Sequence, residues 1–303
     1  MSLVEKTFKN GETIINEGEV GNSFFRLLEG KAYVFSNFGK KDQMQLAMLE
    51  TGEYFGEMAI IETNPRSATI IAKGNVTVIE IPADELNKYF EKNPDQIIVL
   101  MCLLGKRVAA MTKDYNDAQK LLKDLKEADD KKKSGSLFSK IKKHIDLYQS
   151  NKDKLDEPVV EELRETLETT GDEGFGQIET LEAGTIIYNE GDVDETMYIL
   201  HVGTVGFYKN YGSSDEVKES ELNDNSFFGE LGLLVGEPRT NTAVAEYDDT
   251  YVEIIKPDDL ETIFLSCPVK INMLLKHLTR RLRKLNVDFL RTCKEITETY
   301  DAK

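Results

Sequence analysis

Two short stretches of the sequence carry the residue types that a small anionic ligand requires. The first reads FGEMAI at 55–60 and continues, after four residues, as PRSAT at 65–69, while the second reads FGELGL at 228–233 and continues as PRTNTA at 238–243. Each stretch holds a glutamate nine positions before an arginine, and one offset relates both pairs, since 230 − 57 equals 239 − 66. A repeat that keeps both charges in register indicates a duplicated binding unit.

The chemistry of such a unit follows from its residue types. Gly followed by Glu at the start of a short apolar stretch allows close backbone approach and leaves amide N–H groups at a helix start, where anions bind. An arginine guanidinium suits phosphate because it is planar, always charged and rich in donors. An ionised glutamate only accepts hydrogen bonds, so it requires hydroxyl or N–H donors. A ligand with one phosphate and a neighbouring hydroxyl satisfies both residues, and a cyclic ribose phosphate has both.

The two stretches resemble the phosphate-binding cassette of the cyclic nucleotide-binding domain family, which includes protein kinase A regulatory subunits and catabolite activator proteins. The resemblance implies that Glu57 and Glu230 hold the ribose 2′-hydroxyl and that Arg66 and Arg239 neutralise the cyclic phosphate. The remaining residues of the implied cradles are Gly56, Met58, Ala59, Ser67 and Ala68 in the first cassette, and Gly229, Leu231, Gly232, Thr240 and Asn241 in the second. Asn241 departs from the family pattern, which more often has Ala there.

An alternative interpretation is that each Glu and Arg only pair with each other in a domain of this fold that binds no ligand. Family members of that kind typically lose the arginine. Because both charges are kept in both copies, the sequence favours binding of a cyclic nucleotide in at least one of them.

Composition limits the class of protein. A length of 303 residues predicts about two domains, and 40% hydrophobic with 31% charged residues is typical of a soluble globular protein. The net charge of −17 argues against a nucleic-acid surface. The three cysteines are widely spaced, which favours reduced thiols in a cytoplasmic protein. We find no signal peptide, and no apolar run is long enough for a membrane span.

The rest of the chain predicts the elements that position the cassettes. Short β-favouring segments separated by turn residues include 24–28, 31–35, 68–72 and 76–81 in the first copy, and 197–200 and 203–208 in the second. We therefore expect a mainly β protein with α-helices: two tandem β-barrel or jelly-roll domains, each followed by a long C-terminal helix. The predicted domains are residues 1–128 and 174–303, joined by a charged helical connector at 129–173.

Two proline positions predict where the long helices begin. Pro94 and Pro268 each precede an apolar stripe with helical spacing, which is typical of core packing or of a helix pairing seam. In the family this helix lies over the nucleotide and often forms dimers. By the resemblance, Thr112 and Asn286 fall near the position that can contact the base. The neighbouring basic set at 280–284 is interpreted as a solvated or salt-bridged face.

The connector contains two segments of opposite charge. Residues 131–143 include six lysines and no acid, and the apolar residues from 137 to 148 can line one face of a short helix. Such a helix can contact membranes or partners, but docking on its own protein is favoured. Residues 153–173 are acidic with helical spacing, so the two segments can pair.

No catalytic constellation accompanies the cassettes. The three histidines are scattered without a nucleophile or a metal-ligand spacing, and no P-loop or kinase motif occurs, so we expect neither an enzyme nor a cofactor. We also expect no helix-turn-helix domain after the second copy and no inhibitory arginine-rich segment before the first.

Two functions remain. The first is a sensor that binds cAMP or cGMP and signals by helix movement to a separate protein partner, or by self-association through the long helices. The second is a constitutive scaffold whose nucleotide sites are vestigial. Thr240 occurs in family members that accept cGMP, while Ser67 is compatible with cAMP, and the sequence does not decide between the two ligands.

Overall fold

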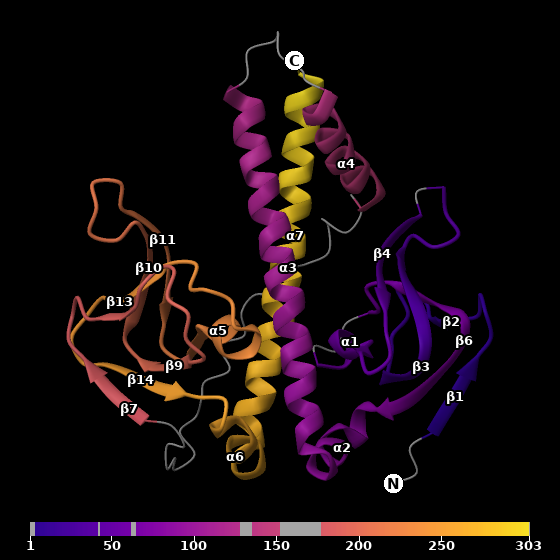
Figure 1. Ribbon diagram of the computed structural model, residues 1–303, viewed down its shortest axis with the longest axis horizontal. Coiled ribbons are helices and arrows are strands. Elements are labelled where there is room, and N and C mark those ends of the chain that lie inside the picture. Colours follow the sequence, from indigo (N-terminus) through magenta and orange to yellow (C-terminus); the bar gives the residue numbers. More distant parts are fainter. Residues whose placement is uncertain (1–3, 42, 62–64, 128–134, 152–176, 303) are drawn as a thin grey trace. The chain divides into compact units, whose positions relative to one another are not determined.

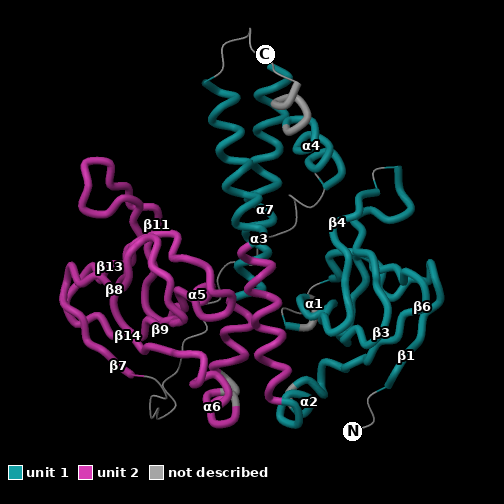
Figure 2. Tube along the Cα trace, viewed as in Figure 1, with its two compact units in different colours: residues 1–93, 110–159, 278–303 teal, residues 94–109, 160–277 magenta. Residues whose placement is uncertain are grey.

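The computed structural model describes residues 4–41, 43–61, 65–127, 135–151 and 177–302 (Figure 1). The part of the chain that it describes divides into two compact units (Figure 2). Unit 1 comprises residues 1–93, 110–159 and 278–303, and unit 2 comprises residues 94–109 and 160–277. No helix among the described residues is long and apolar enough to cross a membrane.

The first cassette belongs to an antiparallel sheet in unit 1. Its strands are β1 (Val4–Phe8), β2 (Thr13–Ile15), β3 (Ser23–Ser36), β4 (Met44–Leu49), β5 (Tyr54–Phe55) and β6 (Thr69–Pro82). The order is β1-β6-β3-β4, with β2 paired to β6 and β5 paired to β3. Inward-facing residues of these strands form one apolar core, which includes Ile15, Phe25, Leu27, Phe55 and Val78. These strands therefore surround a single apolar interior.

One expectation about this sheet is wrong. The sequence predicted separate strands at 24–28 and 31–35 and again at 68–72 and 76–81, whereas β3 and β6 are each continuous over 14 residues. Gly30 and Gly74 do not end the strands, because the β3–β6 ladder absorbs the irregularity as register shifts near Glu29. A bulge of this kind bends a strand without terminating it.

The second cassette lies on two antiparallel sheets in unit 2. Their strands are β7 (Gln177–Leu181), β8 (Ile186–Tyr188), β9 (Met197–Val202), β10 (Thr204–Lys209), β11 (Val217–Asn223), β12 (Ser226–Phe228), β13 (Thr242–Ala245) and β14 (Thr250–Ile255). The orders are β11-β10-β13-β8 and β12-β9-β14-β7. The core between them includes Tyr188, Tyr198, Leu200, Phe228 and Val252. The predicted fold class, two tandem β domains each followed by a long helix, is confirmed.

Helices lie within and after each cassette. The short ones are α1 (Glu57–Ile61), α2 (Leu86–Lys92), α5 (Glu230–Val235) and α6 (Asp259–Ser266), with a 3-10 turn at Ala83–Glu85. The long ones are α3 (Pro94–Glu127) and α7 (Pro268–Asp301). Both long helices begin at the predicted proline, since proline lacks the N–H that a first helical residue would leave unpaired.

A helical cluster in unit 1 joins the connector to the long helices. Helix α4 (Gly135–Asn151) places Ile141, 2% exposed, against the C-terminal halves of α3 and α7. The buried residues of this bundle cluster are Ala118, Leu121, Leu122, Leu125, Ile141, Phe289, Cys293 and Ile296. At the far end of α4, the buried Ser36 hydroxyl donates to Asn151 Oδ1 at 2.8 Å. The prediction that the basic helix docks on its own protein is therefore confirmed for the described residues of α4.

The remaining expectations about the connector lie outside the described residues. These are the acidic helix at 153–173, its pairing with the basic segment, and the boundaries at 128 and 173. The division of the sequence into domains at 1–128 and 174–303 stays a prediction. The two units divide both long helices, since residues 94–109 of α3 belong to unit 2 and residues 278–301 of α7 belong to unit 1 (Figure 2).

Candidate functional site

Each cassette begins with a glycine that turns the chain into a short helix. Gly56 has φ 76° and Gly229 has φ 73°, in the left-handed region that glycine adopts without steric cost. The residues that follow, Glu57 and Glu230, are the first residues of α1 and α5. The predicted Gly-Glu entry into a helix is therefore present in both copies.

The two glutamates of the cassettes are buried. Glu57 is 2% exposed and Glu230 is 0% exposed. In unit 2, Oε1 of Glu230 lies 3.9 Å from Nε2 of His277 on α7. An ionised carboxylate only accepts hydrogen bonds, so a ligand hydroxyl that reached either glutamate would meet an acceptor.

Arg66 is held in the first cassette by backbone carbonyls. It is 7% exposed, and its guanidinium donates to the carbonyl of Gly56 at 2.5 Å and to the carbonyl of Ser23. Burial lowers the pKa of Arg66, while the negative charges of Glu57, Glu19 and Glu80 oppose this effect. The group stays cationic, because arginine ionises far above neutral pH. Two of its five N–H donors are used by these carbonyls, and the carboxylates act on it through charge.

Arg239 has a more crowded environment in the second cassette. It is 5% exposed, and Nη1 donates to the carbonyl of Gly229 at 2.6 Å, as Arg66 does to Gly56. It also forms a two-point pair with Asp194, in which Nε donates to Oδ2 at 2.9 Å and Nη2 donates to Oδ1. Nη2 further donates to the carbonyl and hydroxyl oxygens of Thr196 at 2.7 and 2.9 Å. The guanidinium lies 4.3 Å from the centre of the Tyr188 ring, a cation–π contact.

The alternative interpretation expected Arg239 to pair directly with Glu230, but a different carboxylate holds Arg239. Its hydrogen-bonded carboxylate is that of Asp194, whereas Glu230 lies beside His277. In the first cassette Arg66 donates to carbonyls, and Glu57 acts on it through charge. In both cassettes the arginine thus donates its hydrogen bonds to groups other than the cassette glutamate.

The other predicted cradle residues lie on the same two segments of each cassette as these charges. Met58 and Ala59 belong to α1, and Leu231 and the buried Gly232 belong to α5. After the arginines, Ser67 and Thr240 are exposed, while Ala68 and Asn241 are half-buried. Their hydrogen bonds to a ligand stay a prediction.

The two residues expected near the base lie on the long helices. Thr112 on α3 and Asn286 on α7 are both half-buried, and Nδ2 of Asn286 donates to the Leu282 carbonyl in its own helix at 2.9 Å. Their contact with a base also stays a prediction.

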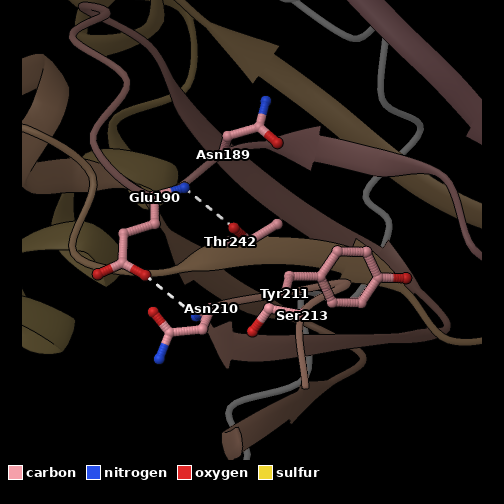
Figure 3. Close-up of a pocket in the computed structure, with 6 residues that line it drawn as sticks. All are labelled: Asn189, Glu190, Asn210, Tyr211, Ser213 and Thr242. Carbon is pink, nitrogen blue, oxygen red and sulfur yellow. Dashed lines mark hydrogen bonds between the residues drawn. The ribbon is translucent and has the colours of Figure 1, made fainter. Parts of the chain in front are cut away.

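An open pocket of about 420 Å³ lies beside the second cassette (Figure 3). The described residues that line it are Asn189, Glu190, Asn210, Tyr211, Ser213 and Thr242. Its wall is fixed by the Glu190 amide, which donates to Oγ1 of Thr242 at 3.0 Å (Figure 3). Thr242 follows Arg239 by three positions, but neither Arg239 nor Glu230 lines the pocket. The pocket is therefore a feature next to the cassette and separate from its charged groups.

Comparison with known families decides the relationship. The sequence model described as "Cyclic nucleotide-binding domain" matches twice, at residues 5–93 and 178–267. The chain belongs to the cyclic nucleotide-binding domain family. Each match contains one complete cassette, so the predicted resemblance is confirmed for both copies.

Individual relatives of this member of the cyclic nucleotide-binding domain family match parts of the chain. It is 44% identical over 72 residues to a cGMP-dependent protein kinase of Plasmodium berghei. The aligned region covers 24% of this chain and 8% of that kinase. It is 43% identical over 96 residues to cGMP-dependent protein kinase 2 of Mus musculus, and this aligned region covers 28% of this chain and 13% of that kinase. The chain therefore spans only a small part of the curated relatives that it matches. Among solved structures, the regulatory domain of Toxoplasma gondii PKA with cAMP is 17% identical, with 91% of this chain and 84% of that chain covered and a TM-score of 0.28.

Sequence reasoning missed the groups that surround the arginines. Asp194, Thr196 and Tyr188 contact Arg239, and Ser23 contacts Arg66, yet none was a predicted site residue. A signal for them existed, because the offset that relates the two cassettes also relates Ser23 to Thr196. The offset could have been followed back into the loops before β3 and β9.

Proposed function

We propose that this protein is a cyclic nucleotide sensor without catalytic activity, which binds a nucleotide in each of its two cassettes. The observation that carries the proposal is the repeated pair of a buried glutamate and a buried arginine inside both family matches. The arginine supplies the positive charge for one phosphate, and the glutamate supplies the acceptor for one hydroxyl. The absence of a catalytic constellation in the sequence supports a binding role.

The ligand is a purine 3′,5′-cyclic monophosphate, cAMP or cGMP. The names of the curated relatives support cGMP, since these kinases are described as cGMP-dependent. Ser67, which is compatible with cAMP by the family resemblance, supports cAMP in the first cassette. The cassettes differ in this residue after the arginine, because the second has Thr240, and the difference supports unequal preferences for the two bases.

The output of the sensor is a movement of helices that a separate protein partner reads. A ligand shifts a conformational equilibrium only by its different affinity for the two states. The helices that follow each cassette are suited to transmit such a shift, because α2 leads through Asn93 into α3 and α6 leads through Cys267 into α7. We place the protein in the cytoplasm, which the three free cysteines support.

Calorimetric titration of the full chain with cAMP and with cGMP tests the proposal. We expect two ligands per chain, with one site removed by Arg66→Ala and the other by Arg239→Ala. Loss of a guanidinium from a buried phosphate site should reduce affinity by about 100-fold or more. Arg291→Ala is the matched control, because Arg291 is an exposed arginine of α7 that pairs with Asp288.

The result that would refute the proposal is an absence of binding of either nucleotide to the folded wild-type chain. That result, with helix and strand content intact by circular dichroism, would leave a scaffold with vestigial sites. Partner binding or self-association that is unchanged by nucleotide would overturn only the signalling part.

A further inference from the structure

The two cassettes can be superposed residue by residue through their hydrogen bonds. Three hydrogen bonds donated by backbone N–H groups in the first copy recur in the second, at the offset that relates Glu57 to Glu230. The bond from Glu17 N to Thr69 Oγ1 corresponds to that from Glu190 N to Thr242 Oγ1. The bond from Gly18 N to Arg66 O corresponds to that from Gly191 N to Arg239 O. The bond from Arg66 N to Glu19 O corresponds to that from Arg239 N to Asp192 O. Their lengths agree closely, because the three pairs measure 3.1 and 3.0 Å, 2.9 and 2.8 Å, and 2.8 and 2.8 Å. Position 194 is therefore the equivalent of position 21.

The residue at position 21 has no side chain to contact the arginine, whereas the residue at position 194 pairs with it. In the first cassette position 21 is glycine, and a Cβ placed there would lie 2.1 Å from Nε of Arg66. The guanidinium therefore occupies the space that any side chain at position 21 would need. In the second cassette position 194 is aspartate, and its carboxylate meets Arg239 at two points.

The Asp194–Arg239 pair uses the same donors that a phosphate needs. Bidentate pairing of two parallel N–H groups is the arrangement by which arginine binds either a carboxylate or a phosphate. Together with the bonds to Thr196 and Gly229, it directs Nε, Nη1 and Nη2 toward protein acceptors. A phosphate that approaches Arg239 must displace this carboxylate or share the guanidinium with it, next to a second negative charge. Arg66 has only carbonyl partners among the described residues to which it donates, so no such exchange is required there.

We propose that Asp194 is an affinity-determining residue, a competitor within the protein that occupies Arg239 and makes the second cassette the weaker of two unequal cyclic nucleotide sites. The inference rests on the proposed function, which it refines by ranking the two sites. Replacement of one charge-assisted pair by another, with an extra negative charge nearby, should weaken the second site by about 10-fold or more relative to a cassette without the aspartate. The Tyr188 ring, which lies against the guanidinium where the first cassette has Ile15, holds Arg239 in the competing position.

Calorimetric titration with cAMP and cGMP tests the inference on the full chain carrying Arg66→Ala, so that only the second cassette binds. Asp194→Gly, which restores the residue of the first cassette, should raise the affinity of the second site by about 10-fold or more. Asp194→Asn keeps the shape but removes the charge, and it should raise the affinity in the same direction. Glu195→Gln, which removes the charge of the exposed neighbouring side chain, is the control and should change the affinity little.

The reciprocal substitution tests the same idea without Arg66→Ala, in case that change prevents folding. Because a Cβ at position 21 would already lie 2.1 Å from Nε of Arg66, Gly21→Asp is compared with Gly21→Ala in a chain that keeps both arginines. The aspartate should weaken the tighter of the two sites resolved in the titration by more than the alanine does. Unchanged affinity of the second site in both Asp194 variants, with binding otherwise intact, would overturn the inference and leave the proposed function standing. Failure of the folded wild-type chain to bind either nucleotide would instead overturn the proposed function.

Discussion

Replacement of Glu57 with Ala should weaken cAMP binding to the first cassette, and it should do so only while the ligand carries its 2′-hydroxyl. The glutamate is 2% exposed at the first residue of α1, nine positions before Arg66. If its carboxylate accepts the ribose hydroxyl, removal of either partner removes the same hydrogen bond. The two removals together should then cost little more than one.

The size of the effect follows from the burial of Glu57. A hydrogen bond to a charged group contributes about 1.5–3 kcal/mol, so loss of the 2′-hydroxyl should reduce the affinity of the wild-type cassette by about 10- to 150-fold. With Ala at position 57, 2′-deoxy-cAMP and cAMP should bind almost equally. Glu57→Gln keeps an oxygen acceptor without the charge, and a neutral hydrogen bond of about 0.5–1.5 kcal/mol should leave a preference of about 2- to 12-fold.

The assay is a calorimetric titration of cAMP and 2′-deoxy-cAMP into the full chain carrying Arg239→Ala, so that only the first cassette reports. Glu19→Gln is the control, because the Glu19 side chain is exposed and acts on Arg66 through charge. It should change the affinity for both ligands equally. Equal loss on removal of the hydroxyl in wild type and in Glu57→Ala would show that the two groups do not meet and would refute the assignment.

Three further outcomes are expected from groups outside the ligand contacts. Lys270→Met should destabilise the fold by about 1.5–3 kcal/mol in urea unfolding, because Lys270 lies 3.1 Å from the fully buried carboxylate of Glu253 and its loss removes a hydrogen-bonded cation, while His201 at 2.8 Å still contacts that carboxylate. A loss below about 0.5 kcal/mol would contradict this. Burial raises the pKa of the Cys293 thiol to about 12, so iodoacetamide at pH 8 should modify this thiol only after denaturation. The less buried Cys267 should react in the native protein, and mass spectrometry can follow both modifications. Burial acts to raise the pKa of Asp194, but hydrogen bonds from Arg239 and Thr196, together with the positive charge of Arg239, outweigh it and the pKa lies below its usual value. A carboxyl group whose pKa is depressed in the folded state stabilises the fold at pH values above its unfolded-state pKa, near 3.9. This stabilisation is lost as the pH falls through the folded-state pKa. The melting temperature of wild type minus that of Asp194→Asn should therefore decrease over this acidic range, and a difference that stays constant would contradict the pairing.

Much of this arrangement could be predicted from local sequence. The glycines before Glu57 and Glu230, with the arginines nine positions later, identified the two cassettes because chemistry at a binding site restricts residue types at fixed spacing. The start of α3 could be placed at Pro94 because proline interrupts a helix when it lies in the interior but is favoured at the first helical position.

The errors and omissions arose where the outcome depends on tertiary neighbours. The continuity of β3 through Gly30 is decided by its ladder with β6, which no local pattern reveals. Asp194 reads as one of many acids in the loop before β9, and only its position equivalent to Gly21 gives it a role. Sequence periodicity predicted the apolar stripes of both long helices but did not indicate which halves of them pack together.

The bundle cluster has a consequence for the order in which the polypeptide can fold as it leaves the ribosome. Oγ1 of Thr292 accepts a hydrogen bond from Gln119, and the two residues are 173 positions apart. At about 5–20 residues per second, the ribosome needs about 10 to 35 seconds to add that many residues. The first barrel can close during that time, and Ile141 of α4 can cover part of the cluster. Leu121, Leu122 and Leu125 are covered in full only after the C-terminal half of α7 has been synthesised. A pause in translation between the two cassettes would lengthen this exposure and give chaperones, or a second nascent chain, access to the C-terminal half of α3.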